Sequence, residues 1–195
     1  MDGKNDVLND ISDIKRYLML LLSSNNDEPI NGKMWYQKEL FILSKNDEAL
    51  FDESGFEPYF WGPYSELAES EMDELVQLGL VENEGSKYVL THFGKEEAGK
   101  LIRSVPRQEK ELVDDIKQFL NDFSKDELLL FIYVSYPEMC EDAVELRDVI
   151  RKRKEVAIGL YKKGKISIGR AAELAGISIS RLIKELQERN LYRVE

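Results

Sequence analysis

The sequence predicts a mainly α-helical protein with one small β-hairpin, and three observations support this fold class. Apolar residues recur at helical spacing along most of the chain, as they do from Val7 to Leu22. Strand-like runs are short and confined to residues 80–90. Serine, threonine and glycine stand at the ends of the helical stretches, where they favour caps. An apolar fraction of 43% in 195 residues is enough for a packed core.

The first half of the chain predicts helices followed by the hairpin. In chain order we expect helices at about 7–22, 33–44 and 66–78, loops at 23–29 and 46–55, and an aromatic segment with Pro and Gly at 56–64. Ser65 reads as the cap of the third helix and Gly79 as its stop. Strands at 80–82 and 87–90 form the hairpin, and a helix follows from Thr91 to about Arg103. A helical cluster closed by a two-stranded wing predicts a winged-helix domain over residues 1–105.

Pro106 breaks the chain, and residues 106–153 predict a helical connector. An acidic amphipathic helix is expected at 109–120 and a longer helix at about 141–163. Between them, Ser124 and Glu127 have the spacing of a capping box, and the helix that they begin ends at Tyr136-Pro137. We expect this connector to contribute to dimer contacts.

Residues 154–195 have the pattern of a helix-turn-helix. Gly164 turns the chain after one helix, and Ser167 caps a short helix that carries small residues. Gly176 suits the tight turn, because glycine accepts a positive φ, and Ser178 caps the next helix. A short helix, a glycine turn and an amphipathic helix are the parts of this motif. The same three-helix pattern also occurs in plain packing or dimerisation modules.

Charge is distributed unevenly along the chain, although the net charge is −11. Residues 147–195 carry 13 basic and 6 acidic residues, whereas residues 1–146 carry 14 basic and 32 acidic ones. The basic segment suits a polyanion, and the acidic remainder does not. The pattern predicts double-stranded DNA as the partner of the C-terminal segment. Because helix-turn-helix units usually bind paired half-sites, we also expect a homodimer.

The predicted DNA-binding residues lie at the start of the two last helices and in the turn before them. They are Lys165, Arg170, Ser178, Ser180, Arg181 and Lys184. Arg181 is placed to read a guanine edge, since residues near the start of the last helix reach base edges in this motif. Lys165, Arg170, Ser178 and Lys184 are better placed for phosphates.

The C-terminal segment resembles a known family. Residues 161–167 read Tyr-Lys-Lys-Gly-Lys-Ile-Ser, and residues 171–178 read Ala-Ala-Glu-Leu-Ala-Gly-Ile-Ser. Together with the residues from Arg153 onward, they resemble the helix-turn-helix of small prokaryotic proteins of an uncharacterised family often described as antitoxins. The resemblance implies DNA contact. Those proteins usually have a short N-terminal piece, in place of which this chain has an unrelated segment.

The N-terminal segment carries a second resemblance. Pro29, Gly32-Lys33, the run Gly62-Pro63-Tyr64-Ser65 and Gly79-Leu80-Val81 are similar to the winged-helix core of the YwgA-type proteins, whose function is not established. The segment from Ser124 to Pro137 is similar to the helices that follow that core. The resemblance implies a winged-helix fold for this domain. Its acidity favours protein contact or dimerisation over DNA.

Several classes are disfavoured by the residue inventory. No apolar run approaches the length of a membrane span, and the N-terminus lacks the features of a secretory signal, so we expect a cytoplasmic protein. One cysteine (Cys140) and one histidine (His92) are too few for a structural zinc site, and no phosphate-binding glycine loop occurs. We therefore expect no enzyme, no cofactor and no metal.

Two rival functions remain open. The chain could be a protein-interaction module, antitoxin-like or an adaptor, that holds a basic partner through its acidic N-terminal part. It could also sense a metabolite in a pocket near Trp61. The aromatic run Tyr59-Phe60-Trp61 with Tyr64 would serve either role as an exposed surface, but core packing beside a turn is the more common arrangement.

Overall fold

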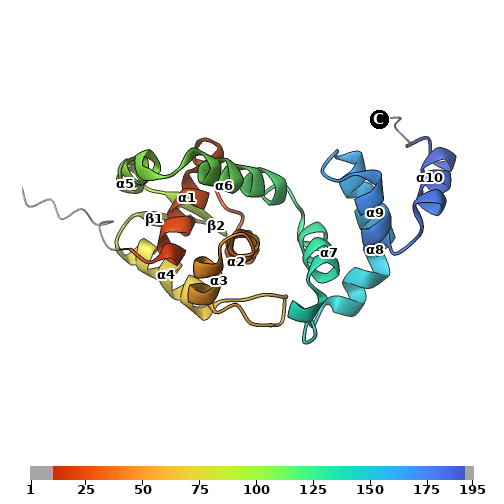
Figure 1. Cartoon of the computed structure of the whole chain (residues 1–195), viewed down its shortest axis with the longest axis horizontal. Helices are drawn as coiled ribbons and strands as arrows, with labels where there is room; N and C mark the ends of the chain where they lie inside the picture. Colours follow the sequence, from red (N-terminus) through yellow and green to blue (C-terminus); the bar gives the residue numbers. More distant parts are fainter. Residues whose placement is uncertain (1–10, 192–195) are drawn as a thin grey trace, which may run out of the picture. The chain divides into compact units, whose positions relative to one another are not determined.

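The computed structural model describes residues 11–191, and the chain divides into two compact units (Figure 1). Unit 1 contains Met1–Glu57 and Pro63–Asp122, and unit 2 contains Pro58–Gly62 and Phe123–Glu195. The predicted starting residues Val7 and Leu8 of the first helix lie outside the described part. A mainly helical fold with one two-stranded antiparallel sheet confirms the predicted class.

Unit 1 consists of six helices and a hairpin in its described part. Their bounds are α1 (Asp13–Asp27), α2 (Lys33–Ser44), α3 (Glu48–Ser54), α4 (Glu66–Gln77), β1 (Val81–Glu84), β2 (Lys87–Leu90), α5 (His92–Ser104) and α6 (Arg107–Leu120). Helix α1 contributes a nearly continuous buried run from Tyr17 to Leu22. It packs against α2, α4, α5 and α6, so it forms the centre of the unit (Figure 1).

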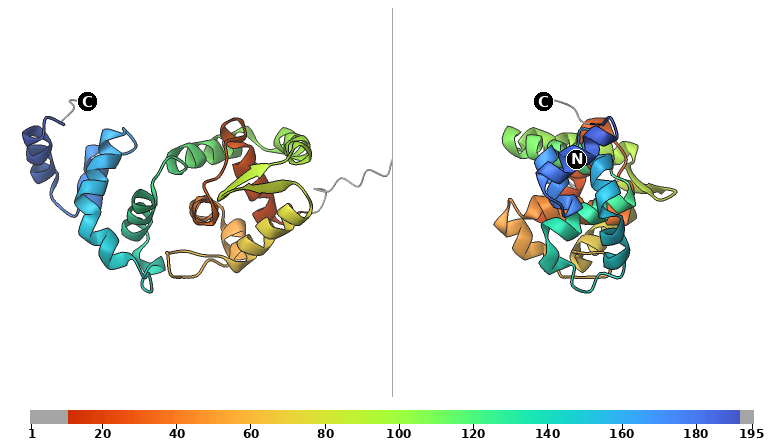
Figure 2. Two further views of the ribbon diagram at one scale, coloured as in Figure 1. Left: turned by 180° about the vertical axis from the view of Figure 1, so that it is seen from behind. Right: turned by 90° about the vertical axis from the view of Figure 1, so that its right-hand side faces the viewer.

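The hairpin of unit 1 packs beside α1 (Figure 2). Val81 pairs with Leu90 and Glu84 with Lys87, and Gly85 and Ser86 make the turn. Ile30 adds a single bridge on the outer side of β2, through two 3.0 Å hydrogen bonds with Tyr88. The predicted hairpin is confirmed: β2 has the expected bounds, and β1 covers Val81–Glu84 in place of the expected residues 80–82.

Two of the buried charged side chains in the described part of unit 1 are completely shielded from solvent. Lys117 of α6 is fully buried, and its ammonium group donates hydrogen bonds to the carbonyl oxygens of Leu21 (2.9 Å) and Glu28 (2.8 Å). The Leu21 carbonyl lies in the last regular turn of α1, where a cation is favoured by the helix dipole, and the Glu28 carbonyl lies in the extended segment after this helix. Glu39 of α2 is also fully buried, and neither carboxylate oxygen has a hydrogen-bond partner in the described part.

Unit 2 is helical throughout its regular structure. Its described elements are α7 (Lys125–Ser135), a 3₁₀ turn (Pro137–Met139), α8 (Leu146–Lys162), α9 (Ile168–Ala175) and α10 (Ile179–Glu188). The capping box predicted at the start of α7 is present: Ser124 and Glu127 exchange hydrogen bonds between side chain and backbone. Helix α8 packs against both α7 and α9, so it is the central helix of this unit.

Two predicted elements differ from the structure. Residues 46–55, expected as a loop, contain α3, because Asp47 caps the helix, Leu50 buries its side chain and Gly55 ends it at a φ of 55°. The helix expected from residue 141 begins only at Leu146. In the preceding residues the chain makes turns, and the Val144 amide bonds the Phe60 carbonyl at 3.0 Å, which a continuous helix would not allow.

The three-part division expected from sequence also differs from the two units. Helix α6, expected in the connector, packs against α1 and α2 through Val113, Ile116 and Leu120. Helix α7 instead packs on α8. The predicted connector of residues 106–153 is therefore shared between the units, because the buried faces of its helices point into different cores.

Candidate nucleic-acid interface

Helix α8 supports the two helices that follow it in unit 2, α9 and α10. Its buried face includes Ala157, Leu160 and Tyr161. Opposite it, Ala171 and Ala172 of α9 are at most 2% exposed. Small side chains at such a contact let the two helix axes approach closely. The closeness of α8 and α9 makes them one support for α10.

The turn between α9 and α10 satisfies the carbonyls at the end of α9. The Gly176 amide donates to the Glu173 carbonyl (3.0 Å), and the Ile177 amide donates to the Ala172 carbonyl (3.1 Å). Gly176 has a φ of 69°, in the left-handed region that glycine adopts without steric penalty. The Ser178 hydroxyl then caps α10 by accepting a hydrogen bond from the Arg181 amide (3.3 Å). The predicted glycine turn and serine cap are confirmed.

Arg153 of α8 holds this turn in place, a role that the sequence pattern does not reveal. Its Nε donates to the Leu174 carbonyl at 2.6 Å and its Nη2 to the Glu173 carbonyl at 3.0 Å. A Cβ atom added at Gly176 would lie 2.5 Å from the Arg153 guanidinium carbon. The backbone angle favours glycine at this position, and a larger residue would also displace the Arg153 guanidinium from its two hydrogen bonds.

Helix α10 has one buried side and one polar exposed side. Leu182 and Leu186 are fully buried, whereas Ser180, Arg181 and Lys184 are exposed. The Lys184 side chain is 79% exposed, and its ammonium group lies 4.0 Å from the Glu188 carboxylate. Surface pairs of this kind contribute little free energy, so they leave a cation available to a ligand. The structure thus brings three of the predicted site residues to one helix face.

Other cations near α10 are paired inside unit 2. Lys154 contacts Glu185 at 2.8 Å, and Arg189 contacts both Glu155 (2.8 Å) and Glu185 (2.7 Å). These hydrogen bonds lower the pKa of Glu155 and the pKa of Glu185. The pairs tie α10 to α8, and they take these cations away from any ligand.

Arg170 and Lys165 have surroundings that differ from those of Arg181. The Arg170 guanidinium lies 5.2 Å from the centre of the Phe131 ring, hydrogen-bonds the Ser135 hydroxyl and pairs with Glu173 at 2.6 Å. It therefore fastens α9 to α7. Lys165 is half-buried in the turn between α8 and α9. Both predicted site residues thus lie around the start of α9 and not on α10.

The acidic residues of α7 reduce the charge that unit 2 presents. Lys152 pairs with Asp126 at 2.9 Å, and Lys163 pairs with Glu127 at 2.7 Å. Counted over residues 123–195, the sequence holds 14 basic and 12 acidic residues, a far smaller excess than in residues 147–195 alone. Within residues 11–191, the exposed cations of unit 2 that have no ion-pair partner are Arg147, Lys162 and Arg181.

The aromatic segment of unit 2 is exposed, so the expectation of core packing is wrong for three of its residues. Tyr59, Phe60 and Trp61 are 44%, 48% and 42% exposed. The Trp61 indole donates to the Glu145 carboxylate at 3.2 Å, and the Lys125 ammonium pairs with the same carboxylate at 2.5 Å. The segment therefore forms a surface loop held by side-chain hydrogen bonding.

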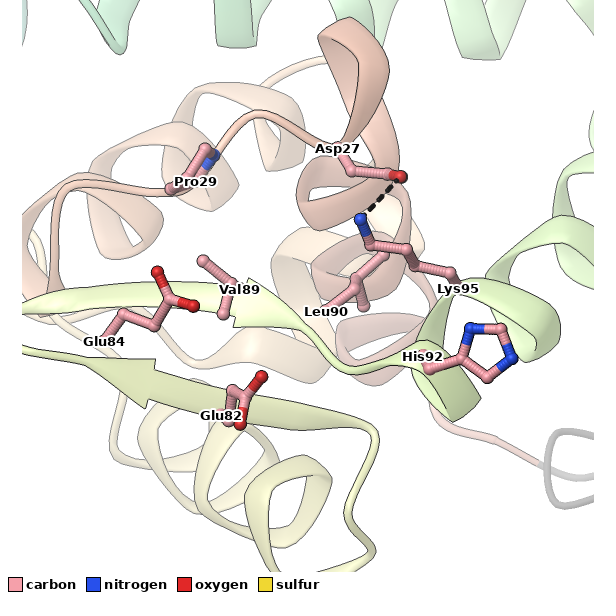
Figure 3. Close-up of a pocket in the computed structure, with 8 residues that line it drawn as sticks. All are labelled: Asp27, Pro29, Glu82, Glu84, Val89, Leu90, His92 and Lys95. Atoms are coloured by element: carbon pink, nitrogen blue, oxygen red, sulfur yellow. Dashed lines mark ion pairs between the residues drawn. The ribbon is translucent and has the colours of Figure 1, made fainter.

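A cavity of about 410 Å³ opens in unit 1, and Trp61 is not among its lining residues. The carboxylates of Asp27, Glu82 and Glu84 line it together with His92 and Lys95 (Figure 3). Lys95 pairs with Asp27 at 3.3 Å. Neither here nor elsewhere in the described part of the chain are three or more His, Cys, Asp or Glu side chains arranged so that they could hold a metal ion. No described helix is long and apolar enough to cross a membrane.

Comparisons with known proteins place the similarity in unit 2. The profile of UPF0175, an uncharacterised protein family, matches residues 132–195. A UPF0175 protein of Halobacterium salinarum is 41% identical over 59 residues, which cover 28% of this chain and 58% of that relative. The chain thus spans less than two thirds of the relative that it matches. No solved structure matches.

The family match includes the whole predicted helix-turn-helix, from the last turn of α7 through α10. It is consistent with the predicted resemblance to an uncharacterised family, and it carries no information on activity. It does not extend to residues 1–131, so the YwgA-type resemblance of the N-terminal segment stays a prediction.

Proposed function

We propose that the chain is a non-enzymatic DNA-binding regulator whose helix α10 enters the major groove of double-stranded DNA. The observation that supports this proposal is the exposed face of α10. Arg181 and Lys184 extend from it while Leu182 and Leu186 are fully buried on the opposite side. A helix with this division can lie in a groove without exposing its core side chains.

The roles of the individual residues follow from their surroundings. Arg181 is the candidate for a guanine edge, since its guanidinium has no ion-pair partner in the described part of the chain. Lys184, Ser180 and Ser178 are candidates for phosphates or bases beside it, and Lys165 is a candidate for a phosphate near the start of α9. Lys162, exposed at the end of α8, joins this set. Arg170 is better explained as a structural residue.

A salt titration of DNA binding tests this proposal. We expect affinity for a random-sequence duplex to fall steeply with salt, because binding would release counterions from the phosphates. Lys184→Ala should weaken all sequences alike and reduce the salt slope by about one. Arg181→Ala should cost about tenfold or more on the preferred sequence, and little on others.

The matched control is Arg103→Ala, which removes an exposed arginine from unit 1. It should leave affinity, salt slope and sequence preference unchanged. If Arg181→Ala and Lys184→Ala bind like the parent protein, the assignment of α10 is wrong. If the parent itself shows no salt-dependent binding, the proposal of a DNA regulator is wrong.

The second candidate is a protein-interaction module, and the composition of unit 1 favours it. The sequence of this unit holds 26 acidic and 13 basic residues. Such a surface repels DNA and attracts a basic protein. The order α4, β1, β2 and the bridge at Ile30 also support a winged-helix-like domain that serves contact rather than DNA reading. Salt-sensitive capture of a basic protein, without a DNA shift, would favour this candidate.

A homodimer is part of the first proposal, because helix-turn-helix units usually bind paired half-sites. Light scattering of the free protein and of its complex with a selected duplex tests it. We expect two chains per duplex. A complex that contains one chain at saturating protein would contradict this part of the proposal and leave α10 as the reading helix.

A further inference from the structure

Ile179, the first residue of α10, is 50% exposed, although the helix buries Leu182 and Leu186 completely. Isolated apolar residues on a surface are ordinary, so exposure alone carries no argument. The position of Ile179 on α10 is what suggests a role in binding. It lies in the first turn of the helix whose exposed face carries Arg181 and Lys184, and this end of a reading helix approaches base edges.

The row of Ile179 on α10 adjoins the polar face. Ile183 lies one turn further along the same row and is half-buried, because the row borders the buried side of the helix. The next row carries Ser180 and Lys184, which are exposed. A ligand that approaches the start of α10 along this border therefore reaches both Ser180 and the exposed side chain of Ile179.

We infer that Ile179 contacts the C5-methyl group of a thymine in the major groove, an inference that rests on the proposed function. The thymine methyl is the apolar group that base pairs present in this groove, and aliphatic side chains pack against it. The neighbouring charges favour a phosphate-bearing partner over an apolar protein surface, since Lys184 would have to lose its hydration against the latter. Ile179 is thus a specificity-determining residue for thymine.

The test begins with selection of preferred duplexes from a random library by the parent protein. Each thymine of the selected duplex is then replaced in turn by deoxyuridine, which removes the methyl group and keeps the base pairing. We expect one position per half-site at which the replacement weakens binding about fourfold, the value of one buried methyl group. Sensitivity to deoxyuridine at no position would overturn the inference.

The variant Ile179→Ala assigns the methyl contact to a side chain. We expect it to bind the thymine and deoxyuridine duplexes equally at the sensitive position. Val144→Ala is the control, because Val144 is 63% exposed in the same unit and outside α9 and α10. That variant should retain the fourfold difference. If Ile179→Ala also retains it, another residue reads the methyl group and the inference is wrong.

These outcomes separate the inference from the proposed function. Selection without enrichment, together with no salt-dependent binding, would overturn the proposed function and the inference with it. Enrichment of a sequence whose thymines tolerate deoxyuridine would overturn the inference alone. Thermal unfolding of Ile179→Ala checks folding, and the deoxyuridine series on the parent protein remains decisive if that variant is unstable.

Discussion

Lys117 and Arg181 show two opposite uses of a cation in one chain. Lys117 of unit 1 is fully buried and donates hydrogen bonds to the carbonyls of Leu21 in α1 and of Glu28 just after it. Arg181 of unit 2 is exposed on α10 and has no ion-pair partner among residues 11–191. The first cation holds three segments together, and the second is available to a ligand.

A local excess of charge in the sequence does not reveal which charged side chains are available to a binding partner. Unit 1 is strongly acidic, yet Glu39 and Lys117 lie in its core. In unit 2 the basic segment looks available from sequence, yet several of its cations are paired with carboxylates of α7 and α8. What remains open to a partner is a small set of residues, among them Arg181 and the weakly paired Lys184 of α10.

The largest effect that we predict concerns the buried cation. Lys117→Ala should lower the free energy of unfolding by about 3–5 kcal/mol, because two carbonyls lose their donor and Glu39 loses the nearby positive charge. Urea denaturation at pH 7 measures it.

The control for this variant is Lys110→Ala, which removes an exposed lysine from the same helix. It should change stability by less than about 0.5 kcal/mol, as surface substitutions usually do. If both variants unfold alike, Lys117 does not have the structural role described here. The difference between the units in their use of cations would then lose its support.

We expect a smaller change in the free energy of unfolding when the pH is varied, because Glu39 is buried in unit 1. Burial raises the pKa of Glu39 from 4.5 to about 7, although the charge of Lys117 opposes the shift. The folded state therefore binds this proton more tightly than the unfolded state does. The stabilisation is complete below pH 4.5 and is lost as the pH rises toward 7 and above.

Comparison of the parent protein with Glu39→Gln measures this contribution together with the interaction between Glu39 and Lys117. Between pH 5 and pH 8 the parent should lose about 2–3 kcal/mol relative to the variant. Urea denaturation across this range gives the difference at each pH. Parallel stability curves for the two proteins would show that the carboxyl group of Glu39 titrates normally.

The features that the sequence predicted well are those set by neighbours along the chain. Ser65, Ser124, Ser167 and Ser178 all cap helices as expected, because a cap needs only an amide three residues further on. The glycine turns were predictable for the same reason. Helix α3 was not predicted, because the segment is acidic and contains only one buried leucine, Leu50, which gives no helical periodicity.

The features that the sequence did not predict depend on residues far apart in the chain. Arg153 looked like one more cation of a basic segment, and its bonds to Leu174 and Glu173 arise only when α9 folds back on α8. Lys117 lies in a helix that the sequence predicts only as acidic and amphipathic, and its two carbonyl partners are about 90 residues or more away along the chain. In the candidate site, the exposure of Ser180, Arg181 and Lys184 followed from helical periodicity, whereas the packing of Arg170 against Phe131 did not.

The smallest of these stability effects distinguishes two glycines of unit 2 that have nearly the same backbone angle. Gly164 and Gly176 have φ values of 71° and 69°. A Cβ atom at Gly164 would meet nothing within 4 Å, whereas one at Gly176 would meet the Arg153 guanidinium. Gly164→Ala should therefore cost only the left-handed strain, about 1 kcal/mol, and Gly176→Ala about 2 kcal/mol.

A double-mutant cycle between Arg153→Ala and Gly176→Ala assigns the extra cost. Once Arg153 is shortened, the clash disappears and Gly176→Ala should cost no more than Gly164→Ala, so the two substitutions will not be additive. Additive effects would mean that Arg153 moves aside freely and does not hold the turn. In that case the orientation of α10 would depend on Leu182, Leu186 and the ion pairs to α8, and the exposed cation would rest on a less rigid support than the buried one.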